Sequence, residues 1–403
     1  MTQPEDYGIV RNKGNGEDLR YGCKTMKRIV LIGPVYPYKG GISHYTGMLC
    51  RALRKKYEVE MISYSLQYPK FLYKKEQKDY EDDFLKIGDT KYLINTANPV
   101  NWLSVASHIR KEKPDLLIIQ WWHPYFAPCY RVLTAHLHRH VRILYVCHNV
   151  FPHERFPADR KLTRMAMRHV HCFTVQSGTD EADLLQIRSD AVYRRTVLPT
   201  FDLFQRSDLT KEDARKKLDI AQEQKVLLFF GFVREYKGLK HLLNALPAVS
   251  ERLGGEEHVR LLVVGDFGSD KETYLTLIEK LGIHPLVKIY DGYIPDREVE
   301  VYFKAADLAV LPYESATQSG IVQVSYGFSL PVVATNVGGL PDVVTDEVTG
   351  YVVEPKRPDL IANAVCEYFE ENRYEEFKKN IEAESYRYSW DRLVEIIEDL
   401  GTA

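Results

Sequence analysis

The 403-residue sequence has no long hydrophobic run. No apolar stretch reaches the roughly 18 residues that a membrane-spanning helix needs, so we expect no transmembrane helix. The first 25 residues also lack the hydrophobic segment of a secretory signal peptide, because they are polar and mixed in charge. They predict a disordered leader over residues 1–25, with Met26 as a candidate functional start.

Cysteine and several common motifs are scarce or missing. The six cysteines show neither CxxC nor metal-finger spacing, and most lie in apolar segments, which predicts reduced, inert core thiols. This usage fits a cytoplasmic location. The sequence contains no GxGxxG motif, which disfavours a dinucleotide-dependent dehydrogenase. It also contains no nucleic-acid-binding module, so we expect no nucleic acid partner.

The formal net charge of −2 conceals a contrast between the halves of the chain. Residues 26–200 carry 27 Lys and Arg against 16 Asp and Glu, a net charge of +11. Residues 201–403 carry 23 against 36, a net charge of −13. A contrast of this size indicates different partners for the two halves. The alternative is a difference in surface charge without functional meaning.

Alternating strand and helix patterns predict a parallel α/β sheet in each half. In the first half, strands are predicted at RIVLIG, EVEMISYS, DLLIIQW, RILYVCH, HCFTVQ and RTVLP. The pattern restarts after Pro199, with strands at KVLLFFG, VRLLVVGD, LVKIYDGY, DLAVLPY, PVVAT and TGYVVEP. The chain is too long for one ordinary core, so we predict two doubly wound domains joined near residues 199–208.

In open parallel sheets, ligands bind at the carboxyl ends of the strands, so residues at those ends are the first candidates. Gly40 and Gly41 follow the first strand and let a ligand approach the backbone at a helix start, although an ordinary tight turn is the alternative. His148 follows RILYVC, where an imidazole can bind a ligand or move a proton; a packed or solvated histidine is the alternative. His123 is a weaker candidate of the same kind.

The second half has its own strand-end candidates. Gly231 ends the segment KVLLFFG and is followed by Arg234 and Lys237. A guanidinium and an ammonium that reach one point suit a diphosphate, whereas solvated loop charges are the alternative. The stretch TQSGIVQVSYGF predicts a helix, and its free backbone N–H groups near Ser319 and Gly320 predict an anion site.

Together these segments resemble a family-4 (group 1) retaining glycosyltransferase of the GT-B fold. The resemblance covers about residues 26–400 and rests on GGISHYTGML, GFVREYKGLKHLLNAL, VVGDFG, GYIPDREVEVYFKAADLAVLPY and PVVATNVGGLPDVVTDEVTGYVVEP, in that order. It implies two Rossmann-like domains that face each other across a cleft. The acceptor domain would be residues 26–200 and the nucleotide-sugar donor domain residues 201–385. The last helix, within residues 386–403, would pack back on the N-terminal domain.

The resemblance also implies roles for single residues. Arg234 and Lys237 match the pair that contacts the donor diphosphate, and His148 matches a histidine that contacts the transferred sugar, so these three are the catalytic candidates. Gly40 and Gly41 match a glycine loop beside the donor phosphates and the acceptor. The other donor-binding candidates surround strand and helix ends of the second half: Gly231, Glu314, Gln318, Ser319, Gly320, Ile321, Val322 and Val324.

The sequence departs from the family at two acidic positions separated by seven intervening residues, which normally bind the sugar and the ribose. Here they are Ala316 and Val324. Glu314 would replace the first if the loop shifts, and Gln318 and Gln323 could supply neutral hydrogen bonds. The departure keeps open an inactive partner subunit that binds a nucleotide-sugar without reacting.

The resemblance and the residues together predict the reaction. Arg234, Lys237 and the helix start would stabilise the charge on the leaving diphosphate, so we expect no metal and no other cofactor. The substrate would be a UDP- or GDP-sugar of hexose type, and transfer would retain the anomeric configuration by front-side attack. A nucleotide-sugar epimerase of the same fold is an alternative.

Two basic segments of the first half, residues 68–75 and 153–171, suggest the acceptor. The first interleaves lysines with aromatic residues, and the second contains five Lys and Arg against two acidic residues. Such a face suits an anionic membrane surface or a lipid-phosphate acceptor. We therefore expect a lipid-linked or polysaccharide acceptor and peripheral attachment to the inner face of the cell membrane. A solvated basic face on a soluble domain is the alternative.

Overall fold

The computed structural model describes residues 26–73, 76–80, 83–152 and 155–402, and the predicted leader lies outside them. The chain forms two compact units. The N-terminal unit contains the described residues up to Thr196 and those from Trp390 onward, and the C-terminal unit is Val197–Ser389. The boundaries therefore fall a few residues from the expected 200/201 and 385/386.

The N-terminal unit has a seven-stranded parallel sheet in the order β3-β2-β1-β4-β5-β6-β7. Its strands are β1 (Arg28–Ile32), β2 (Glu58–Leu66), β3 (Lys91–Asn95), β4 (Leu116–Trp121), β5 (Arg142–Cys147), β6 (Cys172–Val175) and β7 (Val192–Arg195). Its helices are α1 (Gly41–Arg54), α2 (Pro99–Glu112), α3 (Ala127–Leu137), α4 (Asp159–Met167), α5 (Gly178–Ile187) and α13 (Trp390–Thr402), with a short 3₁₀ helix η1 (Pro124–Phe126).

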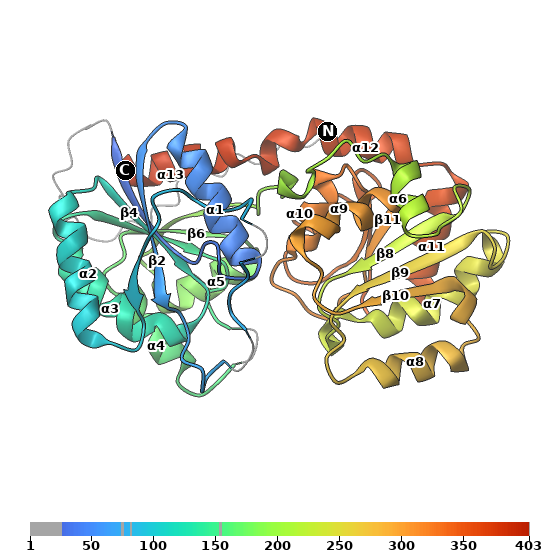
Figure 1. Cartoon of the computed structure of the whole chain (residues 1–403), viewed down its shortest axis with the longest axis horizontal. Coiled ribbons are helices and arrows are strands. Elements are labelled where there is room, and N and C mark those ends of the chain that lie inside the picture. The colour runs from blue at the N-terminus through green and yellow to red at the C-terminus, as the bar shows by residue number, and fades with distance from the viewer. Residues whose placement is uncertain (1–25, 74–75, 81–82, 153–154, 403) are drawn as a thin grey trace. The chain divides into compact units, whose positions relative to one another are not determined.

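Both faces of this sheet are buried, which explains its continuous apolar strands. In β1, Val30 and Ile32 join the core formed with α2, α3 and α4, while Ile29 and Leu31 are equally buried on the opposite face. Helices α1 and α13 cover that opposite face (Figure 1). The strand directions and the two covered faces make this a doubly wound, Rossmann-like unit.

The C-terminal unit has a six-stranded parallel sheet in the order β10-β9-β8-β11-β12-β13. Its strands are β8 (Lys225–Phe230), β9 (Val259–Gly265), β10 (Val287–Asp291), β11 (Leu308–Leu311), β12 (Val332–Thr335) and β13 (Gly350–Val353). Helices α7 (Leu239–Arg252), α8 (Lys271–Lys280) and α11 (Pro358–Glu370) cover one face, and α6 (Lys211–Lys217), α9 (Asp296–Ala305) and α10 (Gly320–Gly327) cover the other (Figure 1). Helix α12 (Tyr374–Ala383) and the 3₁₀ helices η2 (Asp202–Phe204), η3 (Glu235–Lys237), η4 (His284–Leu286) and η5 (Ser385–Tyr388) complete the unit.

Helix α13 follows the C-terminal unit in sequence but packs within the N-terminal unit. Its first residue, Trp390, contacts the ring of Tyr45 on α1 at 5.1 Å between centroids. Farther along, Glu398 accepts a hydrogen bond of 2.6 Å from the Tyr57 hydroxyl. The helix therefore closes one face of the N-terminal sheet with residues from the chain end.

Two strands of the first sheet differ from the sequence expectation. The strand predicted at RTVLP was wrong, because β7 ends at Arg195, where its neighbour β6 runs out at Val175 and leaves no further partner. Edge strand β3 was not expected. Its sequence, KYLIN, is half exposed and has little apolar alternation. Among the described residues, no helix has the length and apolarity that crossing a membrane requires.

Candidate functional site

Three predicted elements meet at the carboxyl end of the C-terminal sheet, around Gly231. A Cβ atom on Gly231 would lie 3.0 Å from Nζ of Lys237 and 3.8 Å from Cδ1 of Ile321 in the first turn of α10. The backbone of Gly231 has a φ of +107°, which glycine adopts without strain. A glycine backbone, an ammonium group and a helix start are thus brought to one place.

Arg234 follows β8, three residues after Gly231, and its guanidinium reaches the loop that follows β9. Its Nη1 donates a 3.0 Å hydrogen bond to the carbonyl oxygen of Val233 and lies 3.1 Å from the position of a Cβ on Gly268. Nearby Lys240 forms an ion pair with Glu314, whereas neither Arg234 nor Lys237 forms one with any carboxylate in the described part of the chain. Two uncompensated cations at a strand end favour binding of an anion.

Helix α10 adds a third positive element. It begins at Gly320, where the free N–H groups were predicted, and Ser319 caps it by accepting a 3.3 Å hydrogen bond from the backbone N–H of Ile321. Its first turn contains no acidic residue, so no side chain offsets the partial positive charge of the helix start. Helix ends of this kind bind phosphate groups well.

The loop before α10 is fixed by the Gly-Gly turn of the NVGGLP segment. The backbone N–H of Gly339 donates a 2.9 Å hydrogen bond to the carbonyl of Thr317. Gly338 has a φ of +54°, and a Cβ there would clash with the carbonyl of Ala316. This close packing holds residues 316–317 in an irregular loop, so these residues are not part of the helix.

Glu314 is the centre of an ion-pair cluster. Its carboxylate lies 2.8 Å from Nζ of Lys240, 2.9 Å from Nε2 of His241 and 3.0 Å from Nζ of Lys356. The hydrogen bonds from Lys240, His241 and Lys356 lower the pKa of Glu314 to about 2, so this carboxyl is ionised at neutral pH. Both of its oxygens are engaged, and its contact with a donor sugar stays a prediction.

The remaining candidates on α10 are largely buried. The Val324 side chain is 6% exposed, so at the family's ribose position it presents an apolar group with almost no access to solvent. Gln323 is fully buried, and neither atom of its amide has a hydrogen-bonding partner among the described residues. Gln318 packs its amide against Gly339 in the Gly-Gly turn. None of these positions shows how a ribose would be held.

In the N-terminal unit, Gly40 and Gly41 stand at the start of α1. Gly40 is the N-cap residue with a φ of +104°, and the first turn carries no acidic side chain and no side-chain cap. A Cβ on either glycine would meet no atom within 4 Å. The backbone here is open, as a site for close approach of a ligand requires.

His148 follows β5 and is buried as a neutral imidazole. Its Nε2 lies 2.7 Å from Oε1 of Gln120 on β4, and its ring packs edge-on against Tyr45 at 4.6 Å. Burial lowers the pKa of His148 to about 3. At neutral pH it therefore carries no positive charge, and its neutral ring can donate one hydrogen bond and accept another. By contrast, His123 caps η1 by accepting a 3.1 Å bond from the N–H of Tyr125.

Gln120 was missed from the sequence, although a signal was present. It is the one polar side chain in the buried strand LLIIQW, and it is fully buried. Its Oε1 contacts His148, while its Nε2 has no partner in the described part of the protein. A single amide in an otherwise apolar strand indicates that a polar group nearby forms a hydrogen bond with it, as His148 does here.

We expect the buried His148 to make the protein acid-sensitive. Its folded pKa of about 3 lies below the unfolded value of 6.5, so its contribution to stability is complete above pH 6.5 and is lost as the pH falls toward 3. Lowering the pH from 7 to 5 should reduce the unfolding free energy of both the wild type and His148→Gln. The reduction should be about 2 kcal/mol smaller in His148→Gln, because this variant has no buried imidazole to protonate. Urea unfolding at both pH values measures this, with His136→Gln at an exposed histidine as control. Equal pH dependence of all three proteins would contradict a neutral, buried His148.

Comparison with known families matches both parts of the chain. Residues 39–199 match the family model described as Glycosyltransferase Family 4, and residues 210–386 match Glycosyl transferases group 1. The chain belongs to the family-4, group 1 glycosyltransferases. This confirms the family predicted from the motifs.

Two curated relatives illustrate the likeness. The chain is 30% identical over 188 residues to an uncharacterized glycosyltransferase of Methanocaldococcus jannaschii, a match that covers 45% of this chain and 46% of the relative. It is 32% identical over 157 residues to the D-inositol 3-phosphate glycosyltransferase of Corynebacterium diphtheriae, covering 38% of this chain and 36% of that one. The chain thus spans less than half the length of each of these relatives.

Solved structures show the fold. HepE of Anabaena, in complex with UDP and glucose, matches with a TM-score of 0.71 and 17% identity over 94% of this chain and 100% of that chain. Sucrose-phosphate synthase of Thermosynechococcus elongatus matches with a TM-score of 0.69 and 18% identity over 93% and 98%. The two parallel sheets together with these neighbours confirm the predicted two-domain α/β GT-B fold.

Proposed function

We propose that this glycosyltransferase moves a hexose-type sugar from a nucleoside-diphosphate sugar to a lipid-linked or polysaccharide acceptor, with retention of configuration. The observation that carries the proposal is the meeting of Gly231, the unpaired Lys237 and the start of α10, beside the unpaired Arg234. This arrangement suits a diphosphate. Support comes from HepE of Anabaena, which shares the fold and is described in complex with UDP-glucose.

In the proposed reaction, an acceptor hydroxyl forms a bond to the anomeric carbon as the bond from that carbon to the diphosphate oxygen breaks. The proton of the hydroxyl passes to the leaving phosphate, on the same face of the sugar. Negative charge that builds on the diphosphate is stabilised by Lys237, Arg234 and the N–H groups of α10. Fixed donors of this kind are commonly worth about 3 kcal/mol each. Neutral His148 would serve as a hydrogen-bonding partner of the sugar rather than as an acid.

We further propose that the reaction needs no metal ion, because the two cations and the helix start supply the positive charge. In the described residues, one group of side chains could hold a metal: Glu60, His108 and Glu112 of the N-terminal unit. Its carboxylates already form ion pairs, Glu60 with Lys91 at 2.7 Å and Glu112 with Arg28 at 3.0 Å. These pairs reduce the attraction of that group for a divalent cation.

One observation favours a second candidate, a subunit that binds a nucleotide-sugar without reacting. Both acidic positions of the family are replaced, and the ribose position, Val324, is a buried apolar side chain.

Incubation with a panel of UDP- and GDP-sugars distinguishes the two candidates directly. The proposed enzyme releases free nucleotide and, with a membrane extract as acceptor source, forms a product whose anomeric configuration by NMR equals that of the donor. Binding without turnover would favour the inactive subunit, and a new nucleotide-sugar without acceptor would indicate an epimerase.

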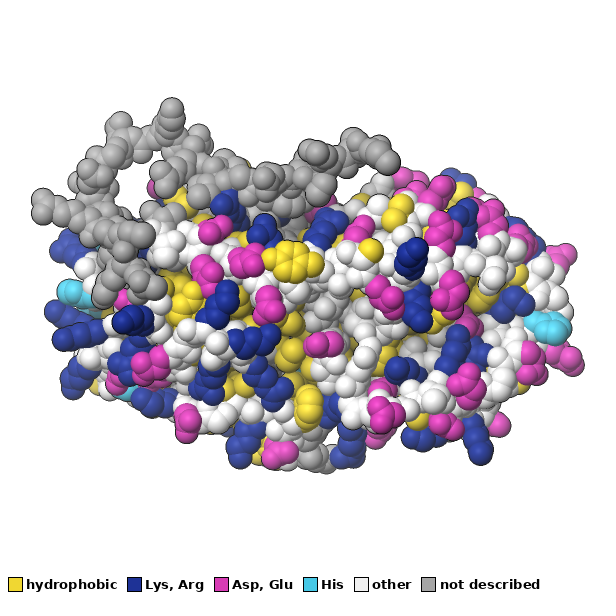
Figure 2. Space-filling view, turned by 90° about the horizontal axis from the view of Figure 1, so that it is seen from above, with side chains coloured by type: hydrophobic (Ala, Val, Ile, Leu, Met, Phe, Trp, Pro, Cys, Tyr) yellow, Lys and Arg dark blue, Asp and Glu magenta, His cyan; other side chains and the backbone are white. Residues whose placement is uncertain are grey.

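The proposal of a membrane-associated acceptor rests on the surface of the N-terminal unit. Exposed Arg160, Lys161 and Arg164 on α4, with Arg168 after it, form no ion pair with a described carboxylate. In the face drawn in Figure 2, Lys and Arg side chains are interspersed with Asp and Glu on both units. Part of the other predicted basic segment, 74–75, lies outside the described residues.

We expect α4 to contribute to binding of anionic membranes. Each Lys or Arg near such a surface contributes about 1 kcal/mol, so reversing two charges in Arg160→Glu with Arg164→Glu should weaken binding at least about tenfold. Co-sedimentation with phosphatidylglycerol-containing vesicles measures this. The control makes the same charge change at exposed Arg110 and Lys111 on α2 of the same unit. An equal loss of vesicle binding in both variants would show that only the net charge of the unit matters and not the position of α4. If the wild type does not bind the vesicles at all, the membrane proposal is wrong.

A further inference from the structure

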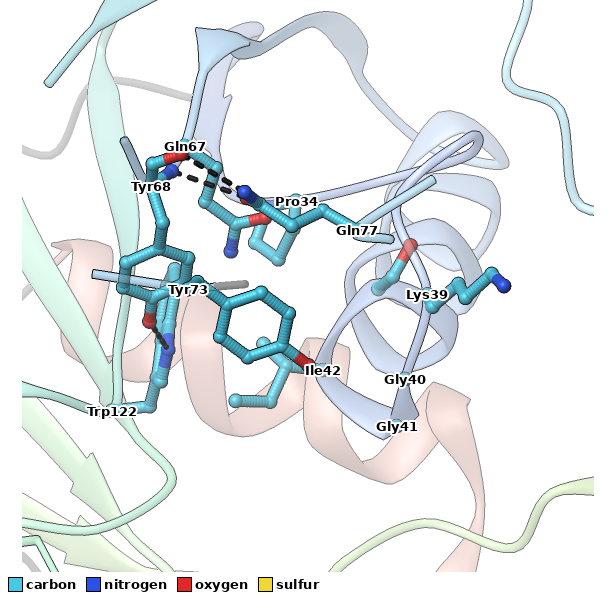
Figure 3. A pocket seen from close by; sticks show the side chains of 11 residues that line it. Pro34, Lys39, Gly40, Gly41, Ile42, Gln67, Tyr68, Tyr73, Gln77 and Trp122 are labelled. Atoms are coloured by element: carbon cyan, nitrogen blue, oxygen red, sulfur yellow. Dashed lines mark hydrogen bonds between the residues drawn. The ribbon is translucent and has the colours of Figure 1, made fainter. Parts of the chain in front are cut away.

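The N-terminal unit contains a cavity of about 200 Å³. It lies beside Gly40 and Gly41 at the start of α1, and its walls include Gln67, Tyr68, Tyr73 and Trp122 (Figure 3). Pockets for drug-sized ligands are larger, roughly 300–1,000 Å³. This cavity therefore suits one small ring rather than an extended chain.

Gln67 carries the chemical signal. Its side chain extends into the cavity (Figure 3), and the residue is 8% exposed. Its amide has no hydrogen-bonding partner among the described residues and is not among the side-chain polar atoms sealed from solvent. The donor and the acceptor of this amide are therefore both available to a ligand in the cavity.

The aromatic wall opposite is held rigidly. Nε1 of Trp122 donates a 3.0 Å hydrogen bond to the Tyr68 hydroxyl, and the Gln77 amide bonds the backbone N–H and carbonyl of Tyr68 at 3.2 and 2.9 Å. The Tyr73 ring stacks on Tyr68 at 5.8 Å between centroids. These contacts fix flat apolar surfaces before any ligand arrives, which lowers the cost of binding.

The described lining of the cavity offers an anion little charge. Among its described residues Lys39 is the one that carries a charge, and its ammonium group points away from the space (Figure 3). The groups left for a ligand are the Gln67 amide, aromatic faces and the open backbone at the start of α1. A pyranose ring matches this combination, because its C–H face packs on aromatic rings and its hydroxyls bond amides.

We propose that this cavity binds one uncharged pyranose ring of the acceptor, with its hydroxyls on Gln67 and its C–H face on Tyr73 and Trp122. The inference rests on the proposed transferase function and narrows it. The acceptor end would be a glycan, whether free or lipid-linked, and not a bare lipid phosphate. The acceptor ring would lie beside the glycine start of α1.

Saturation-transfer NMR on the full chain tests this with methyl α- and β-glycopyranosides of glucose, galactose, mannose and N-acetylglucosamine. At least one should bind the wild type, and its binding should weaken about tenfold or more in Gln67→Leu and in Tyr73→Ala, because each removes a direct contact. Tyr73 is 43% exposed, so its truncation leaves folding intact, and Tyr80→Ala, at a 67% exposed tyrosine outside the cavity, is the matched control.

Two further arms separate the possible failures. Dodecyl phosphate, which has no sugar, should neither bind the cavity nor displace the glycoside. UDP binding should be the same in all four proteins, so loss of UDP binding by the wild type would overturn the proposed function and leave the glycoside result standing. The cavity proposal is overturned if no glycoside binds, if binding survives in Gln67→Leu and Tyr73→Ala, or if dodecyl phosphate competes.

Discussion

Replacing Lys237 with alanine should lower kcat/KM for sugar transfer by about 10²–10³-fold, the usual loss for one preorganised charge-stabilising donor. Nζ of Lys237 lies 3.0 Å from the position of a Cβ on Gly231, and Cδ1 of Ile321 in the first turn of α10 lies 3.8 Å from the same position. Lys237 forms no ion pair with a described carboxylate, so its charge is available to a ligand. Its removal should leave the melting temperature almost unchanged, because no contact with a carboxylate is lost.

The effect of this substitution should divide between binding and rate. A hydrogen bond to a charged group is worth about 1.5–3 kcal/mol, so UDP should bind roughly 10–100-fold more weakly to Lys237→Ala. Any further decrease in kcat/KM beyond that factor would measure how much Lys237 stabilises the leaving diphosphate in the transition state. Lys271→Ala is the control, since Lys271 lies in the same unit and forms an exposed pair with Asp291 at 3.0 Å. If Lys237→Ala transfers sugar as fast as Lys271→Ala, the diphosphate is bound elsewhere.

Replacing Gly338 with alanine should have the second large effect, on both stability and donor binding. Two costs add at this position: a φ of +54°, which costs alanine about 1–2 kcal/mol, and a clash of the new Cβ with the carbonyl of Ala316. The loop that must move leads through Thr317 into α10, because Gly339 holds Thr317 by a 2.9 Å hydrogen bond. The substitution should therefore displace the helix start that the diphosphate needs.

Gly282→Ala isolates the two costs. Gly282 has a φ of +66°, and a Cβ there would meet nothing within 4 Å, so this variant carries the backbone strain alone. We expect Gly338→Ala to lose at least about 2 kcal/mol more unfolding free energy in urea than Gly282→Ala, and to bind UDP more weakly. Equal losses, with UDP binding intact in both, would show that the Gly-Gly turn does not hold the start of α10.

The strands of the two sheets were predictable because both faces of each central strand are buried. Segments such as LLIIQW and KVLLFF are nearly continuous apolar runs. The glycines, histidine and cations that follow such runs indicated candidate ligand-binding positions at the carboxyl ends of the strands. Edge strand β3 escaped prediction because KYLIN lacks such a run. The end of β7 depends on where β6 stops, which no local pattern reveals.

The site was predictable in its charges but not in its packing. The sequence pointed to Arg234, Lys237 and a helix start, but the loop that leads into this helix packs against a Gly-Gly turn that begins at Gly338, 18 residues after Gly320. Gln120 and Gln67 are ordinary glutamines in the sequence. Their meaning comes from tertiary neighbours, His148 for Gln120 and an aromatic cavity for Gln67.

Glu314 is the acidic residue that could replace the first of the two missing carboxylates. Glu314 is close in sequence to the first lost position, but hydrogen bonds from Lys240, His241 and Lys356 engage its carboxylate and lower its pKa to about 2. Its cluster ties α7, through Lys240 and His241, to the loop after β11. Glu314 therefore has a structural role whether or not it also contacts a donor.

Titration calorimetry with UDP, GDP, ADP, CDP and dTDP, each with and without EDTA, tests the central claim most directly. The diphosphate site formed by Lys237, Arg234 and the start of α10 predicts saturable binding of at least one nucleoside diphosphate, unchanged by EDTA and weakened about tenfold or more in Lys237→Ala. No binding of any nucleotide, or binding that EDTA abolishes, would contradict a metal-free donor site at the end of the C-terminal sheet.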